Sequence, residues 1–382
     1  GTWMQRIAQD WLVLTVLTHR NATALGLVMA LQFGPQLLLL PWTGSAADRL
    51  DRRRLLIGTQ LAMGVLALLF GILVLTGAVR LWEAYVFAFL AGCVAAFDAP
   101  ARQSFVSELV GPEDLANAVA LNSASFNAAR MLGPAVAGLT IARFGSGPAF
   151  LINGLSFLAV IVSLLLLRRD ELVPAPRAPR RTGDFLEGLR YAWKTPEIRA
   201  CLGMLVLLGT FGLNFPIFIS TMATGVLHRG ASGYGLLNTV MALGTVAGAL
   251  FAAGRRRPGL RLLSASAAIF GLGFLPGVFW PNFWLFAVSL AVIGCAALIF
   301  ATATNSLMQL ASVPEMRGRV MALRIAVALG GTPIGGPVTG WIADHAGPRA
   351  ALLVGAAAGL GAAIVGLRAS FRRCPDSPAP VK

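Results

Sequence analysis

The chain of 382 residues is 57% hydrophobic and only 12% charged, and its net charge is +15. Soluble domains carry about 25% charged residues, so this composition excludes a soluble multidomain enzyme. The arginines stand in short clusters between apolar stretches, so the positive charge indicates membrane orientation and not nucleic-acid binding.

A membrane-spanning helix needs about 20 mostly apolar residues. Twelve such stretches can be cut from the chain: 1–18, 23–46, 55–77, 81–100, 117–142, 147–167, 199–227, 232–253, 261–279, 283–309, 318–343 and 348–369. They predict an all-α membrane protein of two six-helix bundles, at 1–167 and 199–370, joined by a linker at 168–198 and followed by a tail at 371–382. The chain begins Gly1-Thr2-Trp3, from which we expect the first helix to lack its cytoplasmic start. The cysteines have no paired spacing, which argues against a disulfide framework or a metal site.

The first helix carries two charges, Arg6 and Asp10, on one face, with Gln5 and Gln9 beside them. At 1.5 Å per residue, Asp10 would lie about 12 Å from the outer end of the helix, close to the bilayer midplane. Charges at this depth are expensive and are functional hypotheses by default. Arg130, halfway along the fifth helix, has a similar depth.

Two interpretations of these three charges stay open. They form a buried ion triad that only locks two helices, or they line a central cavity in which the arginines attract an anionic group. In the second interpretation Asp10 binds and releases a proton, because desolvation favours the protonated carboxyl while neighbouring arginines favour the carboxylate. No cofactor is expected beyond a proton gradient.

The loop after the second apolar stretch reads Gly44-Ser-Ala-Ala-Asp48-Arg49-Leu-Asp51-Arg52-Arg53-Arg54. A glycine, an acid and a group of arginines suit a tight cytoplasmic turn between two membrane helices. The fourth helix ends with another acid and base, Asp98 and Arg102. Topology alone would explain the arginines, but it would not explain the two aspartates.

The fifth helix contains Asn127 and, after Arg130, the run Gly133-Pro134-Ala-Val-Ala-Gly138. Proline frees a backbone carbonyl and permits a bend, and glycines permit close approach of a neighbour. Thr332-Pro333-Ile-Gly335 on the eleventh helix is the counterpart. A paired hinge and simple close packing are both compatible with this pattern.

The linker changes character along its length. Its first part is proline-rich and basic, and its second part, from Asp184, places apolar residues on one face of a short helix that would lie on the membrane surface. The segment is either a plain connection between the halves or a binding site for anionic lipid.

The two halves match each other with a constant offset of 202 residues, since 112–145 can be laid over 314–347. This pairs Gly133 with Gly335, Gly138 with Gly340, and Gly145 with Gly347. Parallel repeats of this kind are typical of transporters. In the second half the polar residues of the helices are uncharged, and Asn214, Asn238 and Asn305 are expected to line the facing wall of the cavity.

Arginines concentrate in alternate connections between the helices, which predicts a multi-pass protein with both termini in the cytoplasm. The loop at 44–54 resembles the signature loop of the major facilitator superfamily. The segments 1–11, 100–104 and 117–122 are similar to the branch that includes the enterobactin exporter and related drug exporters. The loop departs from the common pattern at Asp51, where glycine is usual.

The resemblance implies alternating access, a bacterial inner-membrane location, a monomer in the lipid bilayer, and export of a small molecule driven by protons. It also implies a cytoplasmic gate, in which Asp48 caps the eleventh helix and Arg52 pairs with Asp98. The residues alone leave direction open, so uptake or facilitated diffusion without protons is the alternative. A non-transporting scaffold or sensor would not need charges at the midplane, and a membrane enzyme would need a catalytic constellation that the sequence lacks.

Overall fold

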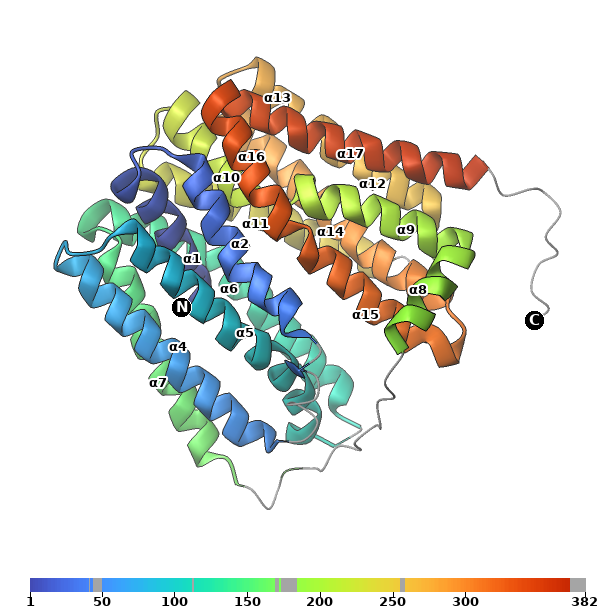
Figure 1. Ribbon diagram of the computed structural model, residues 1–382, viewed down its shortest axis with the longest axis horizontal. Coiled ribbons are helices and arrows are strands. Elements are labelled where there is room, and N and C mark those ends of the chain that lie inside the picture. Colours follow the sequence, from blue (N-terminus) through green and yellow to red (C-terminus); the bar gives the residue numbers. More distant parts are fainter. Residues whose placement is uncertain are drawn as a thin grey trace.

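The computed structural model describes residues 1–40, 42–43, 50–111, 113–168, 172, 184–254 and 258–371. Every regular element within these residues is a helix, and Figure 1 shows the helices in two groups that follow the order of the chain. This arrangement confirms the predicted all-α fold of two bundles.

The first bundle contains the helices up to residue 166. They are α1 (Thr2–Trp11), α2 (Ala22–Leu38), α4 (Arg52–Leu75), α5 (Leu81–Leu109), α6 (Leu115–Phe144) and α7 (Gly147–Leu166), with a π-helical segment, Leu12–Leu17, that continues α1. Short polar side chains begin two of them, because the first backbone N–H groups of a helix lack partners within it. Asn21 accepts from the N–H of Ala24 at 2.8 Å, and Asp51 accepts from that of Arg54 at 3.0 Å.

In the second bundle some spans are single long helices, and three spans are divided into consecutive shorter segments. The helices are α9 (Pro196–Leu207), α10 (Phe215–Thr221), α11 (Ala231–Ala253), α12 (Leu260–Gly273), α13 (Leu275–Phe279), α14 (Phe283–Leu310), α15 (Pro314–Gly330), α16 (Thr332–Ala346) and α17 (Pro348–Phe371). Two π-helical segments, Leu208–Gly212 and Met222–Val226, follow α9 and α10.

Consecutive segments together give the predicted twelve spans. Within the described chain, nine helical stretches are long and apolar enough to cross a membrane, and Ala22–Leu38 is a shorter apolar helix. The remaining two spans are α1 with its π-helical continuation and α6, which carry the charges Arg6, Asp10 and Arg130. The two spans that are least apolar are therefore the ones that carry the charged residues predicted to be functional.

Helix α8 (Asp184–Lys194) comes between the bundles in the chain and packs against α15. Its Glu187 pairs with Arg319 at 2.7 Å, and Gly188 lies against the backbone of Arg319. Trp193 is 67% exposed. The proline-rich part of the predicted linker, and nearly all of the tail, lie outside the described residues, and the domain boundaries remain predictions.

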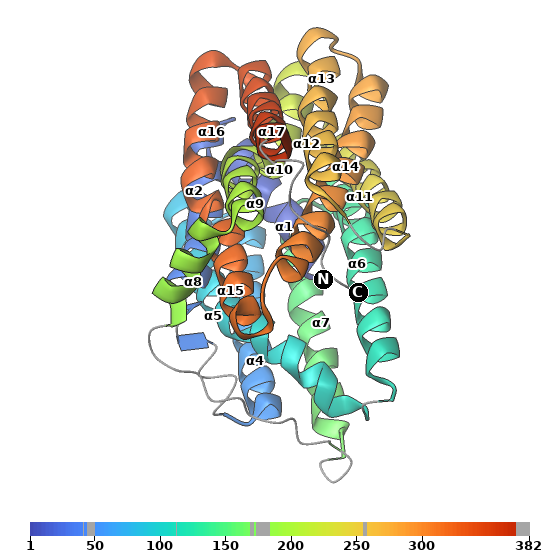
Figure 2. The ribbon, with the colours of Figure 1, turned by 90° about the vertical axis from the view of Figure 1, so that its right-hand side faces the viewer.

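The molecule has two ends, named the linker end and the far end according to which helices begin or end there. The linker end is the end at which α4 begins and α7 ends, and it is at the bottom of Figure 2; the far end is the end at which α2 and α11 begin. Gly145 and Gly347 are matched by the repeat, and both close their helices at the far end with positive φ, +78° and +89°. Only glycine adopts such angles without strain, so the repeat preserves two equivalent turns.

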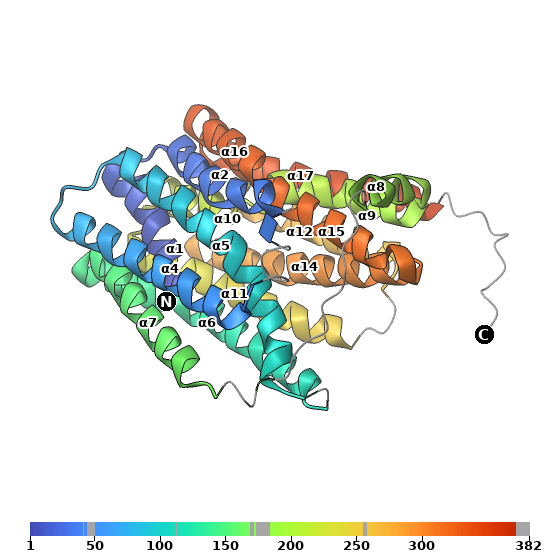
Figure 3. The same cartoon turned by 60° about the horizontal axis from the view of Figure 1, so that its bottom comes forward.

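Two seams join the bundles, one between α2 and α16 and one between α6 and α11. Figure 3 shows α2 running beside α16. Gly26 stands four residues after the start of α2, and a Cβ there would lie 2.4 Å from the carbonyl oxygen of Gly336. Gly235 holds the same place in α11, 2.6 Å from the carbonyl of Pro134. The seams are thus equivalent backbone contacts in the two halves.

Candidate functional site

Asp10 is buried and bonds to the opposite bundle. The hydroxyl of Tyr234, in the first turn of α11, donates to its Oδ2 at 3.1 Å. Tyr234 is itself fully buried, and Trp11 stacks on its ring at 5.8 Å between centroids. Because Gly235, the next residue, belongs to the α6–α11 seam, Asp10 lies at the level of that seam. A titratable acid therefore meets the interface between the two halves.

The two arginines of the predicted site share one aromatic ring. The guanidinium of Arg6 lies 5.0 Å from the centroid of Trp3, and that of Arg130 lies 5.6 Å from it. Both arginines are half-buried. The Nε of Arg6 is buried and has no hydrogen-bond partner among the described residues. The cluster of Arg6, Arg130 and Trp3 thus holds two positive charges, and one of its N–H donors has no hydrogen-bond partner among the described residues.

The predicted ion triad does not form. No ion pair joins Asp10 to Arg6 or Arg130 anywhere in the described chain; Asp10 bonds Tyr234, and each arginine lies near the Trp3 ring. The physical reason is that Asp10 accepts its hydrogen bond from Tyr234 of the opposite bundle, while both guanidinium groups lie over the Trp3 ring. The other open interpretation, charges beside a central cavity, remains a prediction.

The polar neighbours on the first bundle have different surroundings. Gln5 was expected in the cavity, but its Oε1 accepts from Asn153 of α7 at 2.5 Å within the same bundle. Gln9 is only 2% exposed, and its Nε2 has no partner among the described residues. Asn127 is half-buried and donates to the carbonyl of Ser123 at 2.8 Å. Gln9 thus keeps an unengaged donor, whereas Asn127 bonds within its own helix.

The asparagines of the second bundle are likewise divided. Asn238 donates to the carbonyl of Tyr234 at 2.9 Å and so lies beside the Asp10 contact. Asn305 is half-buried on α14. Asn214 was expected to line the cavity, but it is fully buried and donates to Thr210 and to the Thr339 hydroxyl of α16 at 3.2 Å. Its amide holds two helices of one bundle together.

The second bundle also contains a charge that the sequence analysis overlooked. Arg324 is half-buried on α15 and donates to the carbonyl of Ala301 on α14 at 3.1 Å, while its Nε has no partner in the described part of the chain. The expectation of uncharged helices in this half is therefore wrong. The repeat offered a signal, because Arg324 falls on Asn122 of the polar fifth helix. Tyr234 gave no signal, since it lies in an apolar stretch.

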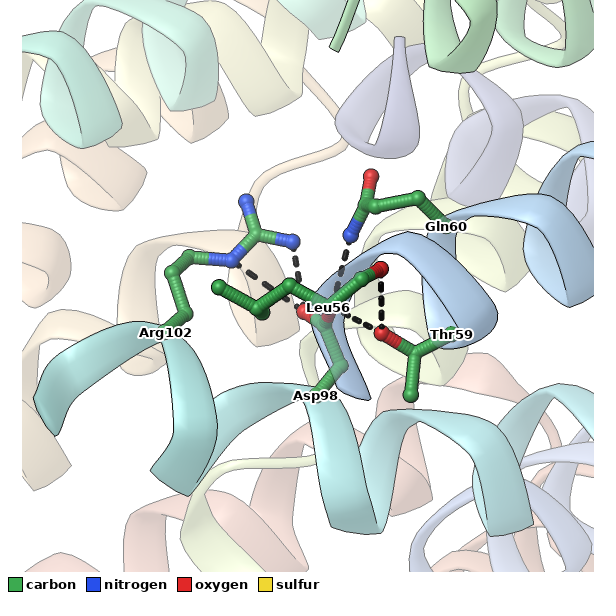
Figure 4. Close-up of polar contacts among 5 residues, drawn as sticks. All are labelled: Leu56, Thr59, Gln60, Asp98 and Arg102. Atoms are coloured by element: carbon green, nitrogen blue, oxygen red, sulfur yellow. Dashed lines mark hydrogen bonds and ion pairs between the residues drawn. The ribbon is translucent and has the colours of Figure 1, made fainter. Parts of the chain in front are cut away.

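The predicted gate is partly described. Asp98 is buried and collects three side chains, as Figure 4 shows: the hydroxyl of Thr59 at 2.9 Å, Nε2 of Gln60 at 2.6 Å and Nη2 of Arg102 at 2.5 Å. The expected pairing of Arg52 with Asp98 is wrong, because Arg52 forms its ion pair with Glu108, ten residues further along α5. Gly44, Asp48 and Arg49 lie outside the described residues.

Asp51 departs from the signature loop for a local reason. It is the residue before α4, and its side chain caps the first turn of that helix. An N-cap aspartate stabilises a helix where glycine would contribute less.

The predicted hinges are places of close packing. A Cβ on Gly133 would lie 2.6 Å from Cβ of Trp3, and one on Gly138 would lie 2.9 Å from the carbonyl of Ala231. Helix α6 continues unbroken through Pro134, whereas α15 ends at Gly330 and α16 starts two residues later, before Pro333. Gly335 abuts the backbone of Thr210. The two counterparts therefore differ, and only the second coincides with an interruption of the helix.

Two clefts lie on the first bundle near the linker end. One, of about 380 Å³, is lined by residues that include Arg54, Thr59 and Cys93, and another, of about 260 Å³, includes Gln60 and Arg102. Both border the Asp98 network and not the Asp10 contact.

The family described as transmembrane secretion effector matches residues 1–379. The chain is 26% identical over 349 residues to the staphyloferrin A transporter of Staphylococcus aureus, covering 90% of this chain and 86% of that protein. It is 29% identical over 377 residues to the multidrug efflux pump Tap of Mycolicibacterium fortuitum, covering 92% and 88%. It is 25% identical over 361 residues to the enterobactin exporter EntS of Escherichia coli, covering 92% and 83%.

Solved structures share the fold at low identity. The nucleoside transporter NupG superposes with a TM-score of 0.76 at 13% identity, covering 98% of each chain. An inward-facing, occupied structure of a bacterial homologue of the lysosomal transporter Spinster superposes with a TM-score of 0.73 at 16% identity, covering 99% of this chain and 97% of that one.

Proposed function

We propose a direction, an energy source and a cargo class for this chain. The chain belongs to the transmembrane secretion effector family of the major facilitator superfamily, and it is a membrane transporter rather than an enzyme. It exports a small amphipathic or anionic compound in exchange for protons. The bond between Asp10 and Tyr234 is the observation that carries this proposal.

Proton coupling is supported by the place of that bond. Asp10 is buried, and its acceptor oxygen is engaged by the opposite bundle. Protonation would remove the charge that strengthens this hydrogen bond, and so weaken one of the ties between the bundles. Loading a proton and separating the halves are thereby linked in one contact.

The cargo class follows from the cluster around Trp3. Arg6 and Arg130 bring two positive charges close to one indole ring, and neither pairs with an acid in the described chain. An anionic group would satisfy the arginines, and an aromatic or apolar body would pack on the indole. Relatives named for staphyloferrin A, for enterobactin and for multidrug efflux fit siderophores or drugs of this chemistry. We include Gln9, Asn127, Asn238 and Asn305 in the cavity.

The orientation follows from charge. Arginines gather at the linker end, in Arg52–Arg54, Arg102, Arg317 and Arg319, so this end faces the cytoplasm. Both termini then lie in the cytoplasm, and the protein acts as a monomer in a bacterial inner membrane. Transport proceeds by alternating access, with the two bundles rocking about the central site.

The test is an efflux screen in a bacterial strain that lacks its own exporters. Cells that express the chain should retain less of an anionic siderophore, or of an anionic drug, than cells that express Asp10→Asn. Equal retention of every compound by the two strains would contradict the proposal. The alternative, uptake without proton coupling, would instead make cells that express the chain retain more of the compound than cells that lack it. Collapse of the proton gradient would then leave that retention unchanged.

A further inference from the structure

The far end of the α2–α16 seam carries an aspartate from one bundle that bonds a helix of the other. Asp344, in the last turn of α16, accepts from the backbone N–H of Ala22 at 2.7 Å and of Thr23 at 2.8 Å. The hydroxyl of Thr23 adds a third bond at 2.6 Å. These N–H groups belong to the first turn of α2, where helical N–H groups have no partner within the helix. One bundle therefore caps a helix of the other.

The cap of α2 is divided between the bundles. Asn21, from the first bundle, satisfies only the N–H of Ala24. The two N–H groups before it depend on Asp344. A carboxylate at a helix N-terminus is also favoured by the helix dipole. Separation of α2 from α16 would remove all three of the bonds to Asp344 at once.

Close packing holds Asp344 within reach. Gly340 stands one turn before it, and a Cβ there would lie 2.3 Å from the carbonyl oxygen of Ala22. The backbones of the two helices thus touch immediately below the cap. A side chain at this position would push α16 away and lengthen every bond of Asp344.

The equivalent seam lacks this device. In the repeat, Ala142 holds the position that Asp344 holds 202 residues later. Helix α11 begins after Gly230 with no acid in its first turn, and no side chain of the described residues caps it. Both seams therefore have the close glycine packing, but only the α2–α16 seam has the charged cap. Packing alone does not require the acid.

We propose that Asp344 is a gating residue that latches the far end of the transporter closed. This inference rests on the alternating access proposed above. Because Asp344 is exposed, water can solvate both the carboxylate and the freed N–H groups when the bundles part. The latch therefore biases the equilibrium toward the closed far end without preventing its opening.

The test measures distances at both ends of the molecule in proteoliposomes by double electron–electron resonance. Spin labels are placed at Arg143 and Pro281 for the far end, and at Gln103 and Gln309 for the linker end, all of which are exposed. The four native cysteines are replaced by alanine. Asp344→Ala should raise the population with a long far-end distance about tenfold, as expected for loss of a helix cap. Asp344→Asn should give a smaller rise, because its amide oxygen still accepts.

Glu83→Ala is the matched control. Glu83 caps the backbone N–H of Arg80 at 2.8 Å, also at the far end, but within one bundle. Its loss should leave the population ratio at the wild-type value. Two populations in the wild type that do not change in Asp344→Ala would overturn the latch and leave the transport cycle intact. A single, unchanging population in all variants would overturn both the latch and alternating access.

Discussion

Tyr234 and Asp10 lie on different bundles and share one buried hydrogen bond of 3.1 Å. The bond connects the first helix of the chain with the eighth span, beside the glycine contact between α6 and α11. Separation of the two bundles would therefore break the hydrogen bond of an acid on the first helix.

Removing the hydroxyl in Tyr234→Phe should weaken this tie and preserve the stacking on Trp11. We expect a loss of about 1–3 kcal/mol in the free energy of unfolding, because a buried carboxyl loses its donor. Denaturant titration in detergent measures this value. Tyr85→Phe, which removes a hydroxyl from the first bundle without touching a contact between bundles, is the control. An equal loss in both variants would contradict a special role for Tyr234.

Asp98→Asn should destabilise the linker end. The carboxylate accepts from Thr59, Gln60 and Arg102, and an amide would set an N–H₂ group against one of these donors. A cost of about 1–3 kcal/mol is expected. Asp51→Asn is the control, because asparagine caps a helix as well as aspartate does. Thermal unfolding of the two variants should differ, and identical melting temperatures would argue against the network.

Gly340→Ala should separate α16 from α2. The added Cβ would lie 2.3 Å from the carbonyl oxygen of Ala22, so the helix must move. Overpacking of this kind costs about 1–3 kcal/mol. Gly318→Ala, at an open helical position on α15, should instead be neutral or stabilising by up to about 1 kcal/mol. Equal free energies of unfolding for Gly340→Ala and Gly318→Ala would show that α2 and α16 are not in close contact at Gly340.

Arg6→Gln and Arg130→Gln should each weaken transport of an anionic cargo. The apparent KM is expected to rise about tenfold, because each change removes one of two charges beside Trp3. Arg229→Gln is the control, since Arg229 also lies over an aromatic ring, Phe283, at 5.1 Å, but at the far end. Initial rates of efflux at varied cargo concentration give KM. A rise in all three variants would indicate a loss of packing and not of a binding charge.

The sequence predicted the fold because apolar length and arginine placement depend on the chain alone. Partners across helices depend on how each helix is rotated, which composition does not reveal. Gln5 therefore pairs with Asn153, and Arg52 pairs with Glu108 instead of Asp98. Arg324 lies within the predicted span 318–343, but it was overlooked because it closely follows the loop arginines Arg317 and Arg319. The cap by Asp344 required two spans to meet, and no spacing within either span predicts it.

We propose that proton movement through Asp10 drives export, and an imposed pH gradient across inside-out vesicles tests this most directly. Wild-type vesicles should accumulate the cargo found by the efflux screen above its external concentration. Asp10→Asn, in which the amide oxygen still accepts from Tyr234, should only equilibrate it, and Glu83→Ala should behave as the wild type. Accumulation by Asp10→Asn at the wild-type level would contradict the account.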